Sequence, residues 1–193
     1  KVIEKHNIMV ISDEVYEKII FDGREHFSLA QIESIKDKVL VVNSLSKTYA
    51  MTGWRLGYCM ADTPIRDRMQ IFHQHAVVSA PSYVQPACVQ ALKTDVSGVR
   101  ELFRRRRDDV YRRLTDMGLE VQKPEGAFYM FINIEKYGMA SEAFCTKMLQ
   151  EGLVGLIPGV YFGTEGYMRL SYCYSDEDLK EGLDRIEKFL QTV

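Results

Sequence analysis

Three short apolar runs in the first third of the chain predict β-strands. They cover residues 7–12, 38–43 and 55–60, and each is apolar through most of its length instead of alternating. Such runs are typical of buried strands in a mostly parallel sheet. Asp13 follows the first run and Lys47 lies just past the second. Because chemistry in these sheets gathers beyond the carboxyl ends of the strands, this edge is a candidate site.

Longer segments with helical periodicity come next. Residues 62–80 and 82–93 are predicted as helices, and Pro64 and Pro81 lie near their starts, where proline is tolerated. From Val99 onward, apolar side chains recur on a single helical stripe, which predicts a long helix. The stripe consists of Val99, Leu102, Phe103, Val110, Leu114 and Met117.

After Gly118 the pattern changes to short strands separated by helices, which predicts a compact α+β unit. We place the boundary between this unit and the preceding one inside the long helix, around residue 100. The predicted strands cover residues 119–121, 127–132, 154–157 and 167–172, and the predicted helices cover residues 140–151 and 176–191.

Composition and charge exclude several classes of protein. The 193 residues are 46% hydrophobic with a net charge of −2, so no overall field favours nucleic acid or an anionic membrane. There is no membrane-spanning apolar run and no signal-peptide pattern. The four cysteines are scattered without a C-x-x-C pair, so we expect neither a disulfide framework nor a zinc site, and we expect a cytoplasmic protein. A chain that starts at Lys1, in what reads as a helix end, is expected to be a fragment.

Four consecutive arginines, residues 104–107, are the most basic feature of the chain. Acidic residues four positions away can pair with them on a solvated helix face. The expected pairs are Glu101–Arg105, Arg104–Asp108 and Asp109–Arg113. Because neither interleaved aromatic residues nor an overall basic excess accompanies the run, we expect no nucleic-acid partner.

The most specific motif is residues 44–58, Ser-Leu-Ser-Lys-Thr-Tyr-Ala-Met-Thr-Gly-Trp-Arg-Leu-Gly-Tyr. It places Lys47 directly after an apolar strand, close to Ser44 and Ser46, with Arg55 eight residues later. An enzyme that holds pyridoxal 5'-phosphate (PLP) needs these residue types: an amine to carry the aldehyde as an imine, and hydroxyls and a guanidinium for the phosphate. A lysine in a loop is ordinarily a solvated charge, but this context favours the imine role.

This motif resembles the lysine signature of class I/II aminotransferases, the fold-type I PLP enzymes. The resemblance spans the whole chain and corresponds to roughly the C-terminal half of a family member. It implies an α/β fold. Residues 1–100 would be the C-terminal portion of the large PLP-binding domain, a mostly parallel sheet with helices, and residues 101–193 the small α+β C-terminal domain. It also implies PLP as cofactor and a homodimer whose sites are shared across the interface.

The same resemblance implies roles for two residues after the first strand. Asp13-Glu14-Val15-Tyr16 is similar to the family's Asp-x-x-Tyr, in which the aspartate pairs with the pyridine nitrogen and the tyrosine bonds the phenolic oxygen of the cofactor. A carboxylate at that nitrogen keeps it protonated, which makes PLP a better electron sink. Asp13 as a helix cap and Tyr16 as a packed aromatic are the simpler alternatives, but their position upstream of Lys47 favours the cofactor role.

Four more residues complete the candidate site. By resemblance, Ser44, Ser46 and Arg55 match positions that bind the phosphate, although a serine beside the lysine could serve only the turn. Met168-Arg169-Leu170-Ser171 resembles the strand whose arginine binds the substrate α-carboxylate, an interaction that guanidinium makes bidentately. A local salt bridge of Arg169 is the alternative. The four histidines form no ligand set, and we expect no metal.

The predicted function is therefore an aminotransferase that moves an amino group from an α-amino acid to a 2-oxo acid through a PLP imine on Lys47. A PLP-dependent carbon–sulfur β-lyase, or another fold-type I enzyme such as an aminocyclopropane carboxylate synthase, remains open. An aminotransferase-like regulatory binding domain without turnover also remains open. The pattern does not define the amino donor. The isolated chain, which lacks the rest of the cofactor cradle, is expected to be inactive.

Overall fold

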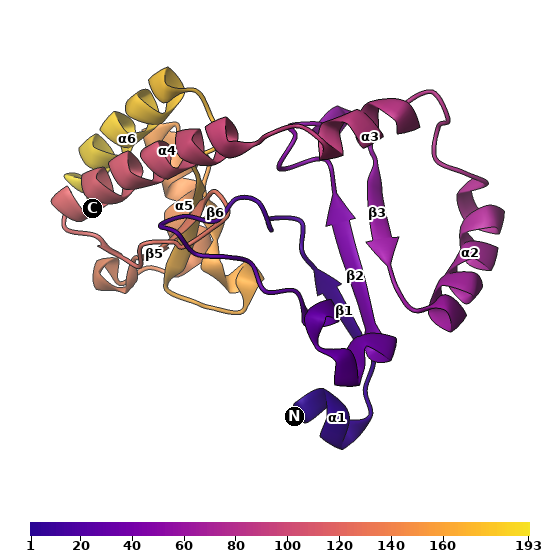
Figure 1. Cartoon of the computed structure of the whole chain (residues 1–193). Helices are drawn as coiled ribbons and strands as arrows, with labels where there is room; N and C mark the ends of the chain where they lie inside the picture. Colours follow the sequence, from indigo (N-terminus) through magenta and orange to yellow (C-terminus); the bar gives the residue numbers. More distant parts are fainter. The chain divides into compact units, whose positions relative to one another are not determined.

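The computed structural model describes all residues, 1–193, and combines helices with two separate β-sheets (Figure 1). The contacts within the chain divide it into two compact units, Lys1–Val99 and Arg100–Val193. The division falls inside the long helix α4 (Ser97–Asp116). No helix is both long and apolar enough to cross a membrane.

The first sheet contains β1 (Val10–Asp13), β2 (Val39–Ser44) and β3 (Gly57–Met60), with β2 in the centre (Figure 1). β1 and β2 are parallel, as predicted, but β2 and β3 are antiparallel. Parallel strands need a long crossover, usually a helix. Residues 45–56 instead form a turn with one short 3₁₀-helix, η3 (Thr52–Trp54), so the chain returns antiparallel.

One face of this sheet is buried and the other is not. Val39 and Val41 of β2 pack on Ile35 from the 3₁₀-helix η2 (Glu33–Lys38). Ile11 of β1, by contrast, is 72% exposed. The prediction of buried strands therefore holds for β2 but not for β1 and β3. Its other helices are α1 (Val2–His6), η1 (Leu29–Gln31), α2 (Thr63–Val77) and α3 (Gln85–Leu92).

The second sheet is antiparallel throughout, in the order β4-β5-β7-β6. Its two long strands alternate: Met130, Ile132, Met168 and Leu170 are buried, and the residues between them are half-buried. Side chains of successive strand residues point to opposite faces, so one face belongs to the core and the other carries aromatic and charged side chains. The strands are β4 (Glu120–Val121), β5 (Tyr129–Asn133), β6 (Ile157–Pro158) and β7 (Tyr167–Ser171).

Of the predicted strand 154–157, only Ile157 lies in a strand, as the first residue of β6. The Val154 N–H donates to the Met148 carbonyl of the preceding π-helix η5 (Met148–Gly152), at 3.4 Å. This backbone group therefore terminates a helix instead of joining the sheet. The remaining elements of the unit are η4 (Glu135–Tyr137), α5 (Ser141–Lys147), η6 (Gly159–Phe162) and α6 (Asp176–Leu190).

The arginines of α4 do not all pair along their own helix. Arg104 bonds Asp108 at 3.0 Å, as predicted. Arg105 instead pairs with Asp176 at 2.6 Å, and Arg113 with Asp184 at 2.8 Å, both on α6. These two predicted pairs are therefore wrong, because the adjacent helix supplies carboxylates that a pattern within one helix cannot reveal.

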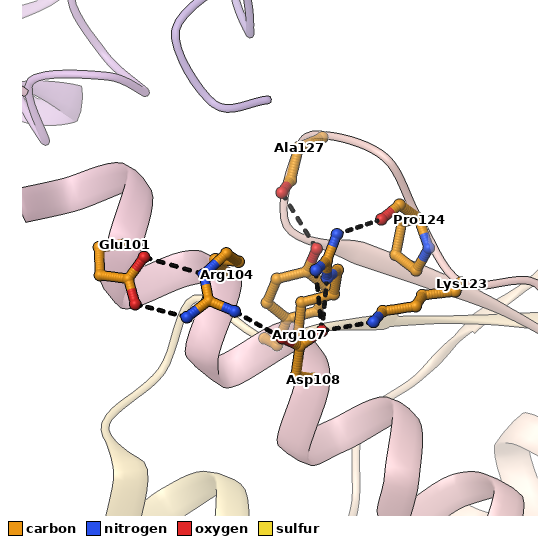
Figure 2. Close-up of polar contacts among 8 residues, drawn as sticks. Glu101, Arg104, Arg107, Asp108, Lys123, Pro124 and Ala127 are labelled. Atoms are coloured by element: carbon orange, nitrogen blue, oxygen red, sulfur yellow. Dashed lines mark hydrogen bonds and ion pairs between the residues drawn. The ribbon is translucent and has the colours of Figure 1, made fainter. Parts of the chain in front are cut away.

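Arg107 is fully buried, although we expected the arginine run to lie on a solvated face. Its guanidinium donates to Asp108 and, at 3.1 Å, to the Pro124 carbonyl (Figure 2). The Tyr172 hydroxyl donates to the Ala127 carbonyl, also at 3.1 Å. Ala127 has a left-handed φ of 58°. Buried donors therefore hold the strained turn that leads into β5.

Candidate active site

The carboxyl end of the first sheet gathers most of the predicted site residues. Asp13, the last residue of β1, lies beside Val42 of β2, and the adjacent Glu14 N–H donates to the Val42 carbonyl at 2.9 Å. Ser44 ends β2 and pairs with Gly57, the first residue of β3. The segment between those strands therefore starts and ends at this edge. The residues brought there are Asp13, Ser44, Ser46, Lys47 and Arg55.

The turn that carries Lys47 is closed by hydrogen bonds and anchored by apolar packing. Ser44 Oγ accepts from the Ser46 N–H at 3.1 Å and donates to the Leu56 carbonyl at 3.3 Å. Leu45 and Met51 are buried together with Cys88 of α3. Lys47 itself is half-buried. A lysine on such a turn has a defined position, which a lysine on a free loop lacks.

Gly57 allows β3 to approach the end of β2 closely. A Cβ at this position would lie 2.7 Å from the Asn43 carbonyl oxygen, so any side chain would force the backbone to shift. The glycine is therefore required by strand contact, and it determines where the turn re-enters the sheet.

The Ser44 and Ser46 hydroxyls and the Arg55 guanidinium differ in the hydrogen bonds that they make within the chain. The Ser44 hydroxyl is engaged in the turn, whereas the Ser46 hydroxyl makes no hydrogen bond within the chain. Arg55 is exposed, has a left-handed φ of 52°, and donates from Nη1 to the Thr52 carbonyl at 2.9 Å. It has no carboxylate partner. A cation without a counter-ion, on the same turn as the free Ser46 hydroxyl, suits a phosphate dianion.

Asp13 and Tyr16 lie where β1 leads into a turn. Asp13 is exposed, and its Oδ1 accepts from the Val15 N–H at 3.2 Å. The aspartate thus closes a turn and does not cap a helix, and its other carboxylate oxygen has no partner in the chain. Tyr16 is half-buried and has a partner within the chain. An exposed carboxylate at this edge fits a protonated ring nitrogen.

Glu14 is a buried carboxylate that the motif itself does not reveal. It is 5% exposed and accepts hydrogen bonds from Ser12 at 3.0 Å and Ser28 at 2.9 Å, with His26 Nε2 at 2.9 Å. Burial opposes its ionisation, but these hydrogen bonds outweigh burial and lower the pKa of Glu14. The carboxylate thereby anchors the backbone immediately after Asp13. No local signal links Glu14 to residues twelve and fourteen positions downstream.

Arg169 belongs to the second unit, Arg100–Val193. It lies on β7 between buried Met168 and Leu170, and it is half-buried on the opposite face of the sheet. It forms no ion pair or hydrogen bond within the chain, so the alternative of a local salt bridge is not observed. Its guanidinium carbon lies 4.4 Å from the centroid of the Tyr129 ring and 4.3 Å from that of Phe162. The sequence analysis missed both rings.

Comparison with known proteins identifies relatives along nearly the whole chain. The family model described as "Aminotransferase class I and II" matches residues 1–186. An aspartate aminotransferase of Pyrococcus abyssi is 41% identical over 97% of this chain and 50% of its own length. The aromatic-amino-acid aminotransferase 2 of Thermococcus litoralis is 38% identical over the same shares.

Solved structures agree with these relatives. The crystal structure of an aromatic aminotransferase from Pyrococcus horikoshii superposes with a TM-score of 0.95 at 40% identity, covering 99% of this chain and 53% of that one. The crystal structure of an aspartate aminotransferase from Thermotoga maritima superposes with a TM-score of 0.91 at 35% identity. The match covers 98% of this chain and 50% of that one. The chain thus spans about half the length of the relatives it matches, and the predicted α/β fold is confirmed.

The cofactor prediction is confirmed as well, because the matched aminotransferases are PLP-dependent. The described residues suit that group: an amine on a rigid turn, a guanidinium without a counter-ion, a free hydroxyl and an exposed carboxylate meet at one sheet edge. With the family model matching residues 1–186 and relatives aligned along nearly all of its length, this chain belongs to the class I and II aminotransferases.

Proposed function

We propose that this chain carries the lysine-bearing part of the active site of a PLP-dependent aminotransferase. The whole enzyme would move an amino group from an α-amino acid to a 2-oxo acid. The observation that carries the proposal is the Lys47 turn, which lies at the carboxyl edge of β1 and β2 in a chain matched by the aminotransferase family over residues 1–186.

Each residue at the edge has a proposed task. Lys47 Nζ would hold the cofactor. Once the substrate amine has replaced it there, the freed Lys47 amine would take the α-proton from the substrate carbon and deliver it to the cofactor carbon that carried the aldehyde. Ser44, Ser46 and Arg55 bind the phosphate. When bound, PLP supplies the electron sink that makes the α-proton removable. Asp13 would keep the ring nitrogen protonated and Tyr16 would donate to the phenolic oxygen, so these two residues would orient the ring.

Arg169 would bind the α-carboxylate that the amino-acid donor and the 2-oxo-acid acceptor share. A guanidinium presents parallel N–H donors to both oxygens of a carboxylate, so it defines the orientation as well as the affinity. Its lack of any carboxylate partner within the chain supports this role. One arginine then serves both halves of the transfer, because the carboxylate does not change in the reaction.

We also propose an assignment for the two units and for the assembly. Residues 1–100 would be the C-terminal portion of the large PLP-binding domain, and residues 101–193 the small domain. The whole protein would be a cytoplasmic homodimer. Four free cysteines support a reducing compartment, and exposed apolar side chains on α2, such as Phe72 at 78%, support a protein partner.

Borohydride reduction of the full-length protein with PLP, followed by peptide mass mapping, tests the cofactor site. We expect a phosphopyridoxyl adduct on Lys47, and we expect Lys47→Arg to lose both the adduct and amino transfer. Lys93→Arg, which changes a lysine on α3's C-terminal flank, should keep both. An enzyme with Lys47→Arg that transaminates at the wild-type rate would contradict the proposal.

Product analysis separates the aminotransferase from the alternatives. The relatives described above are named as aminotransferases, which supports transfer over β-elimination. We expect consumption of the donor to depend strictly on an added 2-oxo acid such as 2-oxoglutarate. Pyruvate released without an acceptor would instead identify a lyase. Binding of PLP and amino acid without any product would identify a regulatory domain.

A further inference from the structure

We propose that Tyr129 and Phe162 are positioning residues for the arginine that binds the substrate carboxylate. Their rings hold the Arg169 guanidinium so that its N–H edge is already oriented when a carboxylate arrives. This inference rests on the proposed function, in which Arg169 binds the α-carboxylate, and it adds two residues to which the sequence analysis assigned no role.

The geometry places both rings against one cation. The guanidinium carbon is 4.4 Å from the Tyr129 centroid and 4.3 Å from the Phe162 centroid. Both distances lie well inside the range of about 6 Å over which a ring attracts a cation. A guanidinium is planar, and its N–H groups point outward in its plane. Two rings can therefore pack on its faces without occupying its donors.

Each ring has aromatic neighbours within its own unit. Tyr129 lies on β5 next to Phe128, whose buried ring stacks on Phe103 at 5.3 Å. Phe162 ends η6, and its ring meets the Phe131 ring edge-on at 6.2 Å. The turn before Tyr129 is itself held by Arg107 and its partners (Figure 2). Both rings are thus attached to rigid parts of one unit.

The charge environment explains why rings and not a carboxylate hold this arginine. Other arginines of the unit have carboxylate partners, as Arg113 has in Asp184 at 2.8 Å. Arg169 has no such partner. A carboxylate from the chain would bind the same donors as the substrate and compete with it. An aromatic ring that stacks on a guanidinium face restrains the cation without competing, because the N–H edge stays open.

The consequence for binding is a smaller entropic cost. A long arginine side chain loses considerable rotamer freedom when it is immobilised. If the rings have already restricted Arg169, that cost does not fall on substrate binding, which is the general benefit of preorganisation. Loss of a ring should therefore weaken carboxylate binding and raise KM more than it lowers kcat.

The test uses the full-length, PLP-loaded enzyme with leucine variants at each ring. We expect Tyr129→Leu and Phe162→Leu each to raise KM for L-tyrosine by roughly three- to thirtyfold. The same factor is expected for L-aspartate, because the two donors share only the α-amino acid core. Tyramine, which lacks the carboxylate, should react at an unchanged rate in the half-reaction. Calorimetry should show the same weakening for 2-oxoglutarate binding to the cofactor-free protein.

Matched variants control for fold and for the ring itself. Tyr129→Phe and Phe162→Tyr keep a ring and should stay near wild type. Tyr161→Leu removes an exposed neighbouring ring that does not contact Arg169, and it should have no effect. Since Phe162 is 45% exposed, its leucine variant is expected to fold, which thermal unfolding can verify.

The outcomes distinguish this inference from the proposed function. If Arg169→Lys leaves KM for L-tyrosine unchanged, Arg169 is not the carboxylate site and both ideas fail. If Arg169→Lys raises KM but both leucine variants bind 2-oxoglutarate like wild type, only the positioning role is overturned. Equal losses with L-tyrosine and tyramine would also overturn it, since they would indicate general damage.

Discussion

Glu14 shows how a single residue can support a site without touching the substrate. Its carboxylate collects donors from Ser12, His26 and Ser28, and its own N–H bonds the Val42 carbonyl of β2. The residue before it is Asp13. Any movement of the Glu14 backbone would therefore displace the candidate partner of the cofactor ring.

We expect Glu14→Gln to destabilise the protein by about 1–2 kcal/mol at pH 7, because it loses charge-assisted hydrogen bonds. The pKa of Glu14 is lowered in the folded protein, so its stabilisation is present above the ordinary glutamate value of 4.5 and is lost as pH falls through the lowered pKa. Urea unfolding should show that the difference in free energy of unfolding between the wild type and Glu14→Gln is smaller at acidic pH than at pH 7.

Glu33→Gln is the matched control for this change, since Glu33 is exposed and forms only a surface pair with Lys36 at 3.6 Å. It should change stability very little at either pH. A wild-type advantage over Glu14→Gln that stays constant down to acidic pH would contradict the ionised, hydrogen-bonded carboxylate.

At the scale of elements, the contact between β2 and β3 determines where the lysine turn lies. We expect Gly57→Ala to destabilise by about 1–3 kcal/mol, because its Cβ would meet the Asn43 carbonyl oxygen at 2.7 Å and push the strands apart. The same shift should reduce the PLP adduct on Lys47. Both effects can be followed by urea unfolding and by borohydride trapping.

Gly53→Ala provides the comparison within the same turn. A Cβ at Gly53 meets nothing within 4 Å, so this variant should keep wild-type stability and labelling. If the two glycine variants behaved alike, close strand contact would not be the reason for Gly57.

Helix α4 contributes a buried arginine to the second unit. We expect Arg107→Met to destabilise the protein by about 3 kcal/mol, because it removes a buried guanidinium that donates to the half-buried Asp108 and to the Pro124 carbonyl. Arg105→Met, which removes an exposed pair with Asp176, should cost under about 1 kcal/mol. Thermal unfolding of both variants measures the difference, and equal losses would contradict the distinct role of Arg107.

For the whole molecule, the chain holds only part of what the reaction requires. We expect residues 1–193 alone to show little or no amino transfer from L-aspartate or L-tyrosine to 2-oxoglutarate, while the full-length protein is active. The chain spans about half the length of its relatives, and the resemblance places other groups that bind the cofactor outside it. Assays at equal concentration test this, and robust turnover by the isolated chain would refute it.

The sequence by itself determined the family, the class of fold and the location of the lysine turn. Apolar runs and the Ser-x-Ser-Lys motif are local, so they can be recognised in the sequence without knowledge of what packs against them. They place β1, β2, β5, β7 and α6 within a few residues of their observed bounds. The roles of Asp13, Tyr16, Ser44, Ser46, Lys47, Arg55 and Arg169 remain predictions.

Only the tertiary structure decided the features that depend on distant partners. The contact of buried Arg107 with the Pro124 carbonyl and the pairing of Arg113 with α6 involve groups far apart in the chain. The antiparallel return of β3 and the shortening of β6 depend on which backbone groups pair, and apolar runs do not specify that. The same holds for the Glu14 cluster and the rings around Arg169. A hydrogen bond or ring contact depends on distances of a few ångströms, and packing, not sequence spacing, determines which side chains come that close.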